Sequence, residues 1–232
     1  MENTTSDLVE NPSEVAPEKT PKKVVQIDGS VIMQIVRHVD TELGAWKLMT
    51  GESIQGYLTG FIDHEDKNCY KYVEVTKSFP SIRPVRLPYE DDHEYRTRIF
   101  AEKQALVSDS VKRFKEQNFD FDLIGFYRAC DYGTGFKADL VKLLFAYQES
   151  SLRAIALLYD PVRTKEQGYL ALRAYTLSDA ALELMKDDHW TPKNIDFQEH
   201  QFSDYLENLP IVVKNSRLTN ALLAQIVVMA MS

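Results

Sequence analysis

Two short apolar runs constrain this chain more than any other feature of its sequence. Residues 123–127 read LIGFY and residues 154–159 read AIALLY, and polar loop residues follow each run. Apolar runs of this length, bounded by turn signals, are typical of strands that lie buried inside a sheet. The sequence therefore predicts a domain built around a covered β-sheet.

Helices and hairpins surround these two strands in an irregular order. Val31, Ile35 and Val39 are spaced by four, which predicts a helix. Asp28 or Ser30 can cap it. The irregular order indicates an α/β fold with a mixed sheet flanked by helices rather than a doubly wound sheet. The other predicted elements are strands over residues 24–27, 53–62, 70–76 and 169–176, a hairpin turn over 63–68, helices over 90–117, 136–147 and 178–185, and a loop over 163–168.

The two ends of the chain differ from its middle. Residues 1–23 are rich in Glu, Pro, Thr and Ser, so they bury too little apolar surface to become ordered, which predicts a disordered tail. Residues 24–213 carry the strands and helices of one domain. Residues 214–232 predict a helix that is apolar nearly all round and therefore needs another surface to pack on. The side chains expected to meet a partner are Leu218, Leu222, Leu223, Ile226, Val227 and Met229.

The composition narrows the class of protein. The formal net charge of −8 argues against autonomous binding to nucleic acid, which needs a concentrated basic surface. Two well-separated cysteines without a secretory signal indicate free thiols in a reducing compartment. The longest apolar run, over residues 221–231, is too short to span a bilayer. We therefore expect a cytoplasmic protein.

Cys130 follows the first apolar run, where enzymes often place reactive groups. A nucleophilic cysteine needs a base and a stabilised thiolate. Arg128 would favour the thiolate and Asp131 would disfavour it, and none of the five histidines lies nearby in the sequence. The favoured interpretation is an inert, buried cysteine. A cysteine-dependent hydrolase that uses Cys130 is the distant alternative.

Three other patterns fit ordinary loops better than binding sites. Residues 63–66 with Cys69 form the only cluster of candidate metal ligands, but they lie on a predicted hairpin and lack a second histidine at a useful spacing. Residues 133–135 read GTG and match neither GxGxxG nor the P-loop pattern. Arg83 and Arg86 lie among prolines in a predicted solvated loop. From these patterns we expect no catalytic residue, no metal ligand and no cofactor.

Several longer strings carry a family resemblance. They are VVQIDGSVIMQIVRH at residues 24–38, SIQGYLTG at 53–60, NFDFDLIGFY at 118–127, LYDPVRT and GYLALRAYTL at 158–164 and 168–177, and PIVVKNSRLTNALL at 210–223. With these strings the chain resembles an MPN domain, the fold of the JAMM zinc isopeptidases, and within that fold most resembles the MPN subunits of eukaryotic translation initiation factor three. The resemblance runs from Val24 to the end, with residues 77–117 poorly matched. It implies an MPN domain over residues 24–213, with a mostly antiparallel sheet, and a C-terminal helical extension over 214–232.

The same resemblance locates a metal site that has lost its ligands. An active JAMM enzyme holds zinc with two histidines and an aspartate, and a glutamate activates the bound water. The resemblance places these four positions at Arg128, Cys130, Val141 and Ser53, and a further motif serine at Ala138. A catalytic zinc needs three protein ligands and an open position. Only Cys130 could bind zinc, and Arg128 would put a fixed positive charge beside it.

The resemblance also implies a non-catalytic role. It implies a non-catalytic scaffold subunit of the initiation factor, whose MPN domain pairs with that of subunit f. The factor binds the small ribosomal subunit, so contact with RNA would be indirect. The alternative within scaffolds is a non-catalytic MPN subunit of the proteasome lid or of the signalosome.

Overall fold

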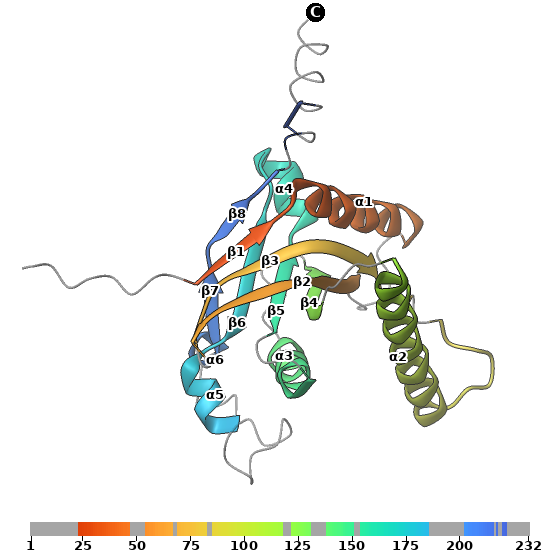
Figure 1. The fold of residues 1–232 in the computed structure, drawn as a ribbon. Helices are drawn as coiled ribbons and strands as arrows, with labels where there is room; N and C mark the ends of the chain where they lie inside the picture. The colour runs from red at the N-terminus through yellow and green to blue at the C-terminus, as the bar shows by residue number, and fades with distance from the viewer. Residues whose placement is uncertain are drawn as a thin grey trace, which may run out of the picture.

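The computed structural model describes residues 23–46, 54–66, 69–82, 85–117, 122–130, 138–150, 154–185, 202–215, 217 and 220–221. An eight-stranded sheet forms the centre of this part of the chain (Figure 1). The strands are β1 Val24–Ile27, β2 Gln55–Asp66, β3 Cys69–Pro80, β4 Asp122–Ala129, β5 Ile155–Tyr159, β6 Leu172–Leu177, β7 Leu206–Leu209 and β8 Ile211–Val213. The helices are α1 Gly29–Trp46, α2 Asp92–Glu116, α3 Ala138–Ser150, α4 Pro161–Gln167, α5 Asp179–Met185 and α6 Phe202–Tyr205.

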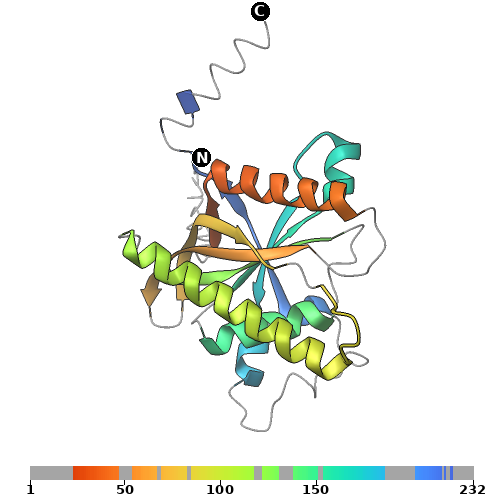
Figure 2. The same cartoon turned by 90° about the vertical axis from the view of Figure 1, so that its right-hand side faces the viewer.

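The sheet is mixed, and helices lie on both of its faces. Its strand order is β7-β6-β5-β4-β2-β3-β1-β8. The β1–β3, β1–β8 and β4–β5 pairs are parallel, whereas the β2–β3, β2–β4, β5–β6 and β6–β7 pairs are antiparallel. Helices α1 and α4 lie on one side, and α2, α3 and α5 lie on the other (Figures 1 and 2). This arrangement confirms the prediction of a mixed, mostly antiparallel sheet flanked by helices.

One kinked segment connects the two ends of the strand order. β7 pairs with β6 and β8 pairs with β1, yet only Pro210 separates β7 from β8 in the sequence. The Pro210 carbonyl accepts a hydrogen bond from the Val25 amide at 2.9 Å. Because this short segment pairs with both ends, the sheet must curl until they meet.

A bulge in β4 sets which side chains face which helices. Leu58 of β2 lies opposite Gly125, but the next residue of β2, Thr59, lies opposite Leu123, so Ile124 is an extra residue. Gly125 adopts a φ of +155°, which L side chains rarely adopt. A bulge of this kind shifts the strict alternation of side chains between the two faces of a strand.

Two hydrophobic clusters fill the two sides of the sheet. The first, called the α1 cluster, includes the apolar stripe of α1, and the second, called the α3 cluster, includes the inner face of α3. The buried members of the α1 cluster are Val25, Ile27, Val31, Ile35, Val39, Leu58, Val73, Val75, Ile124, Tyr127, Ile155, Leu157, Tyr159, Ala174 and Leu209. The buried members of the α3 cluster are Phe126, Leu140, Val141, Leu144, Phe145, Ala154, Ala156, Leu158, Tyr175, Leu177, Ala181, Tyr205 and Leu206. Because side chains alternate along a strand, β4 contributes to both clusters, and the bulge places Ile124 on the same side as Tyr127.

Helix α4 corrects the loop that was predicted over residues 163–168. The Asp160 side chain accepts a hydrogen bond from the Arg163 amide at 2.9 Å and caps the helix. Pro161 occupies the first turn, where its missing N–H costs nothing. Gly168 ends the helix in the left-handed conformation, with φ of 70°. These capping interactions stabilise a helix in a segment without apolar periodicity.

The predicted hairpin turn over residues 63–68 is also corrected. Strands β2 and β3 stay paired as far as Asp66 and Cys69, so the antiparallel ladder runs through most of the predicted turn. The predictions for residues 1–22 and 222–232 lie outside the described residues. None of the helices in the described ranges combines the length and apolarity needed to cross a membrane.

Candidate functional site

The candidate metal positions at the end of β4 are held by neighbouring strands on both sides. Arg128 lies opposite Gln55 of β2 and beside Leu158 of β5. The Cys130 amide donates a hydrogen bond to the Tyr159 carbonyl at 2.9 Å. Hydrogen bonds to β2 and β5 therefore fix the backbone of β4 up to Cys130.

Two of the candidate positions belong to the same apolar surroundings. Val141, on α3, is fully buried in the α3 cluster, and the half-buried Cys130 packs against that cluster. The Cys130 Sγ atom lies 3.7 Å from the Tyr159 carbonyl oxygen, to which it donates. The structure thus brings positions 130 and 141 to one apolar cluster, and the side chains there are packing groups.

The residues present do not fit a zinc ion. Val141 offers only methyl groups, and Arg128, which is half-buried, would bring a fixed positive charge towards the metal. Across the described ranges, no group of three or more His, Cys, Asp and Glu side chains is arranged to hold a metal ion. Ser53 lies outside the described residues, and only the backbone of Ala138 is described.

A polar pair, the buried Tyr127 and the half-buried His38, lies on the face of β4 that points away from the α3 cluster. The hydroxyl of Tyr127 is hydrogen-bonded to Nδ1 of His38 on α1, with 2.8 Å between the two atoms. The two rings meet edge to face, with centroids 5.8 Å apart. Burial raises the pKa of Tyr127. Burial also lowers the pKa of His38 from 6.5, and the charge of Glu42 partly opposes this shift.

Gly56 of β2 makes room for this pair. A Cβ atom added at Gly56 would lie 2.4 Å from the ring and hydroxyl atoms of Tyr127. A side chain at position 56 would therefore displace the tyrosine and its hydrogen bond. Sequence reasoning missed the pair because His38 and Tyr127 lie 89 residues apart and no local pattern links them.

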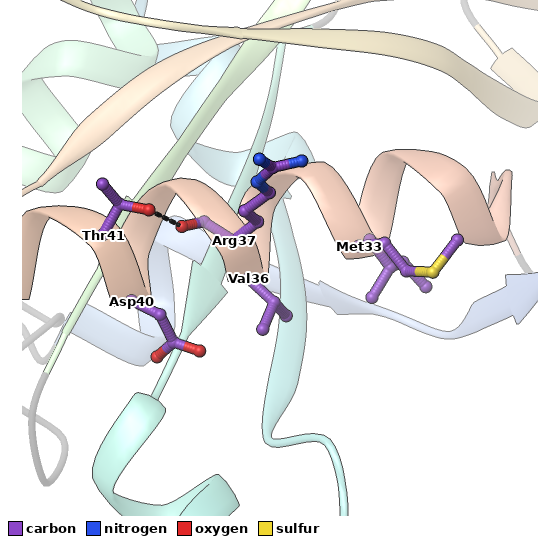
Figure 3. Close-up of a pocket in the computed structure, with 6 residues that line it drawn as sticks. Met33, Val36, Arg37, Asp40 and Thr41 are labelled. Carbon is purple, nitrogen blue, oxygen red and sulfur yellow. Dashed lines mark hydrogen bonds between the residues drawn. The ribbon is translucent and has the colours of Figure 1, made fainter.

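An open groove runs along the exposed side of α1 (Figure 3). Its volume is about 540 Å³, and Met33 at its edge is 55% exposed. Lys165 of α4 lies 3.7 Å from Asp40, which lines the groove. The groove offers a mostly apolar surface with charged side chains at its rim. Its lining residues are Ile32, Met33, Val36, Arg37, Asp40 and Thr41.

Comparison with known families agrees with this fold. A family model described as JAB1/Mov34/MPN/PAD-1 ubiquitin protease matches residues 20–151, which is more than half of the chain, so the chain belongs to the JAB1/Mov34/MPN family. A second family model, described as the C-terminal region of eIF3h, matches residues 165–230. Strands β6, β7 and β8 lie inside this second match, so both matches contribute to one continuous sheet.

The chain is similar to several proteins named as the H subunit of eukaryotic translation initiation factor 3. It is 38% identical to the Brugia malayi protein over 204 residues, which cover 87% of this chain and 52% of the relative. It is 36% identical to the Caenorhabditis elegans protein over 207 residues, covering 88% and 54% respectively. It is 29% identical to the Xenopus laevis protein, with coverage of 88% and 54%. The chain spans about half the length of the curated relatives it matches.

Proposed function

We propose that this chain is a non-catalytic scaffold subunit of eukaryotic translation initiation factor 3, acting in assembly of the initiation complex on the small ribosomal subunit. The observation that carries the proposal is the similarity to proteins named as the factor's H subunit, at 38% identity over 87% of the chain for the Brugia malayi protein. The match of residues 165–230 to a model of the C-terminal region of eIF3h supports the same assignment.

The proposal that the chain is non-catalytic is supported by the residues at the candidate metal positions near the end of β4. The family resemblance assigns metal-ligand positions to Arg128, Cys130 and Val141. A cation, a thiol packed against apolar side chains and a buried valine stand there. A catalytic zinc needs three protein ligands and a position for water. What the chain retains is a stable sheet with surfaces that can bind other subunits.

The proposed partners are other subunits of the factor, in the cytoplasm. The MPN subunit f is the proposed partner of the MPN domain over residues 24–213. The small ribosomal subunit would be reached through the complex, which agrees with the net charge of −8 because contact with RNA is then indirect. The proposed packing surface on the C-terminal segment consists of Leu218, Leu222, Leu223, Ile226, Val227 and Met229.

The experiment that tests this function is capture of the tagged chain from its source cells at low salt, followed by mass spectrometry. We expect subunits of initiation factor 3 and proteins of the small ribosomal subunit. Recovery of proteasome lid or signalosome subunits instead would keep the fold family and overturn the assignment. Recovery of the chain alone would contradict a scaffold role.

The packing surface is tested in the same capture experiment by single charged substitutions. Leu222→Asp and Val227→Asp should lower partner recovery at least about tenfold, because a carboxylate buried in an interface is costly. Asn220→Asp is the matched control, since Asn220 is exposed in the same segment. Wild-type recovery with both Leu222→Asp and Val227→Asp would show that partners bind elsewhere.

A further inference from the structure

The first turn of α1 is capped twice, once by a neighbour and once from the far end of the chain. The Asp28 side chain accepts a hydrogen bond from the Ser30 amide at 2.8 Å, which is an ordinary local cap. The Gly29 amide instead donates to Oδ1 of Asn215 at 3.2 Å, from a residue 186 positions away. The start of α1 is thereby joined to Asn215, the residue directly before the C-terminal segment, which comprises residues 216–232.

Backbone pairing brings Asn215 to this place. β8 runs parallel to β1 with Val213 beside Ile27, and the Lys214 amide donates to the Ile27 carbonyl at 2.9 Å. The Lys214 ammonium lies 3.3 Å from Glu74 of β3. Figure 1 shows β8 running beside β1 towards the start of α1. Asn215 is the next residue, so the sheet brings its backbone beside the start of α1.

Gly29 leaves room for the Asn215 side chain because it has no side chain of its own. A Cβ atom at position 29 would lie 2.3 Å from Oδ1 and 3.3 Å from Cγ of Asn215. Real Cβ atoms essentially never approach another heavy atom so closely. The half-buried Asn215 side chain therefore fits against Gly29 only because the glycine has no side chain.

We propose that Asn215 is a positioning residue that fixes the direction in which the C-terminal segment leaves the domain. The Asn215–Gly29 contact is called the clamp. The segment begins directly after the clamp, and Arg217 and Asn220–Ala221 are already helical. With Asn215 held on α1, the chain continues to the helical residues Arg217 and Asn220–Ala221 from a fixed point beside that helix. The consequence for partners rests on the proposed function, in which this segment carries the packing surface.

The test measures the distance between two spin labels in the full chain. Labels are placed at Arg37→Cys on α1 and at Asn220→Cys, both exposed positions, with Cys69→Ser and Cys130→Ala removing the native thiols. We expect a narrow distance distribution in this parent. Asn215→Ala should broaden or shift it and lower Tm by about 2–4 °C, the usual effect of losing one helix cap.

Asp28→Ala is the matched control, because it removes the other cap of the same turn without touching Asn215. It should lower Tm by a similar amount, about 2–4 °C, and leave the distance distribution narrow. A distribution that stays narrow in Asn215→Ala overturns the proposal. So does equal broadening in Asp28→Ala, which would show that any loss of a cap on α1 loosens the segment.

A second variant breaks the clamp from the other side. Gly29→Ala should broaden the distribution in the parent, but it should cause little further loss of Tm in the Asn215→Ala background, since the clashing atoms are then gone. Additive losses of Tm would contradict the clamp. These measurements need no partner, so they separate failure of the clamp from failure of the proposed function in the capture experiment.

Discussion

The two hydrophobic clusters on either side of the sheet differ in the polar groups that they contain. In the α1 cluster, the buried Tyr127 hydroxyl is hydrogen-bonded to the half-buried His38 of α1, with 2.8 Å between the two atoms. The α3 cluster contains position 141, where the family resemblance assigns a metal ligand, and position 130 packs against it, yet both are occupied by packing groups. The same strand, β4, supplies residues to both sides.

The difference follows from the cost of burying polar groups. A buried hydroxyl or imidazole needs a hydrogen-bond partner, and a buried carboxylate needs a cation, a metal or hydrogen-bond donors. Tyr127 has such a partner, so it is retained. An aspartate at Val141 would place a carboxylate among the apolar side chains of the α3 cluster, so an apolar side chain is the stable choice there.

The largest expected effect comes from restoring the family's aspartate. Val141→Asp should lower the free energy of unfolding by about 3–5 kcal/mol, because it buries a carboxylate among the apolar side chains of the α3 cluster. Urea unfolding followed by circular dichroism measures this. Ala146→Asp on the exposed side of α3 is the control and should change stability by less than about 0.5 kcal/mol. Equal effects of the two variants would remove the basis of the comparison.

Filling the space beside Tyr127 should have an intermediate effect. Gly56→Ala should cost about 1–3 kcal/mol, because the added methyl group overlaps the tyrosine ring. Gly44→Ala on α1 is the matched control: nothing lies within 4 Å of its added Cβ. That variant should instead stabilise by about 0.5–1 kcal/mol, the usual helix preference for Ala over Gly. Chemical denaturation measures the free energy of unfolding of both variants. A loss in Gly56→Ala no larger than in Gly44→Ala would show that the space beside Tyr127 is not tightly packed.

The smallest expected effect is a change of slope with pH. Because burial holds the pKa of His38 below 6.5 in the folded state, the unfolded chain takes up the proton first. The stability contributed by neutral His38 is therefore complete above pH 6.5 and declines as the pH falls below that value. His38→Gln should flatten this decline, whereas His93→Gln, at an exposed position on α2, should not. An unchanged slope in His38→Gln would mean that the histidine stays accessible to protons in the fold.

Local patterns in the sequence predicted most of the sheet and the long helices. The four-residue spacing of Val31, Ile35 and Val39 gave α1, and the two apolar runs gave β4 and β5. Helix α4 was missed because its signals are caps, Asp160 and Gly168, and its interior lacks apolar spacing. β7 was missed because its buried residues, Leu206 and Leu209, are three apart and do not alternate.

The candidate site was predictable only in position. The resemblance placed metal-ligand positions at Arg128, Cys130 and Val141, but their environment depends on the α3 cluster, which joins residues from several strands and helices. The Tyr127–His38 and Asn215–Gly29 contacts join residues 89 and 186 positions apart. Contacts of this kind depend on which strands and helices the tertiary fold brings together, and no local pattern in the sequence encodes that.

The most direct test of the central claim is the zinc content of the purified full chain after incubation with zinc and removal of free metal, measured together with cleavage of a ubiquitin chain. An apolar cluster at the family's metal position predicts no stoichiometric zinc and no cleavage. Stoichiometric zinc accompanied by cleavage would contradict the account. It would mean that side chains at the end of β4 form a metal centre even though the buried Val141 supplies no ligand.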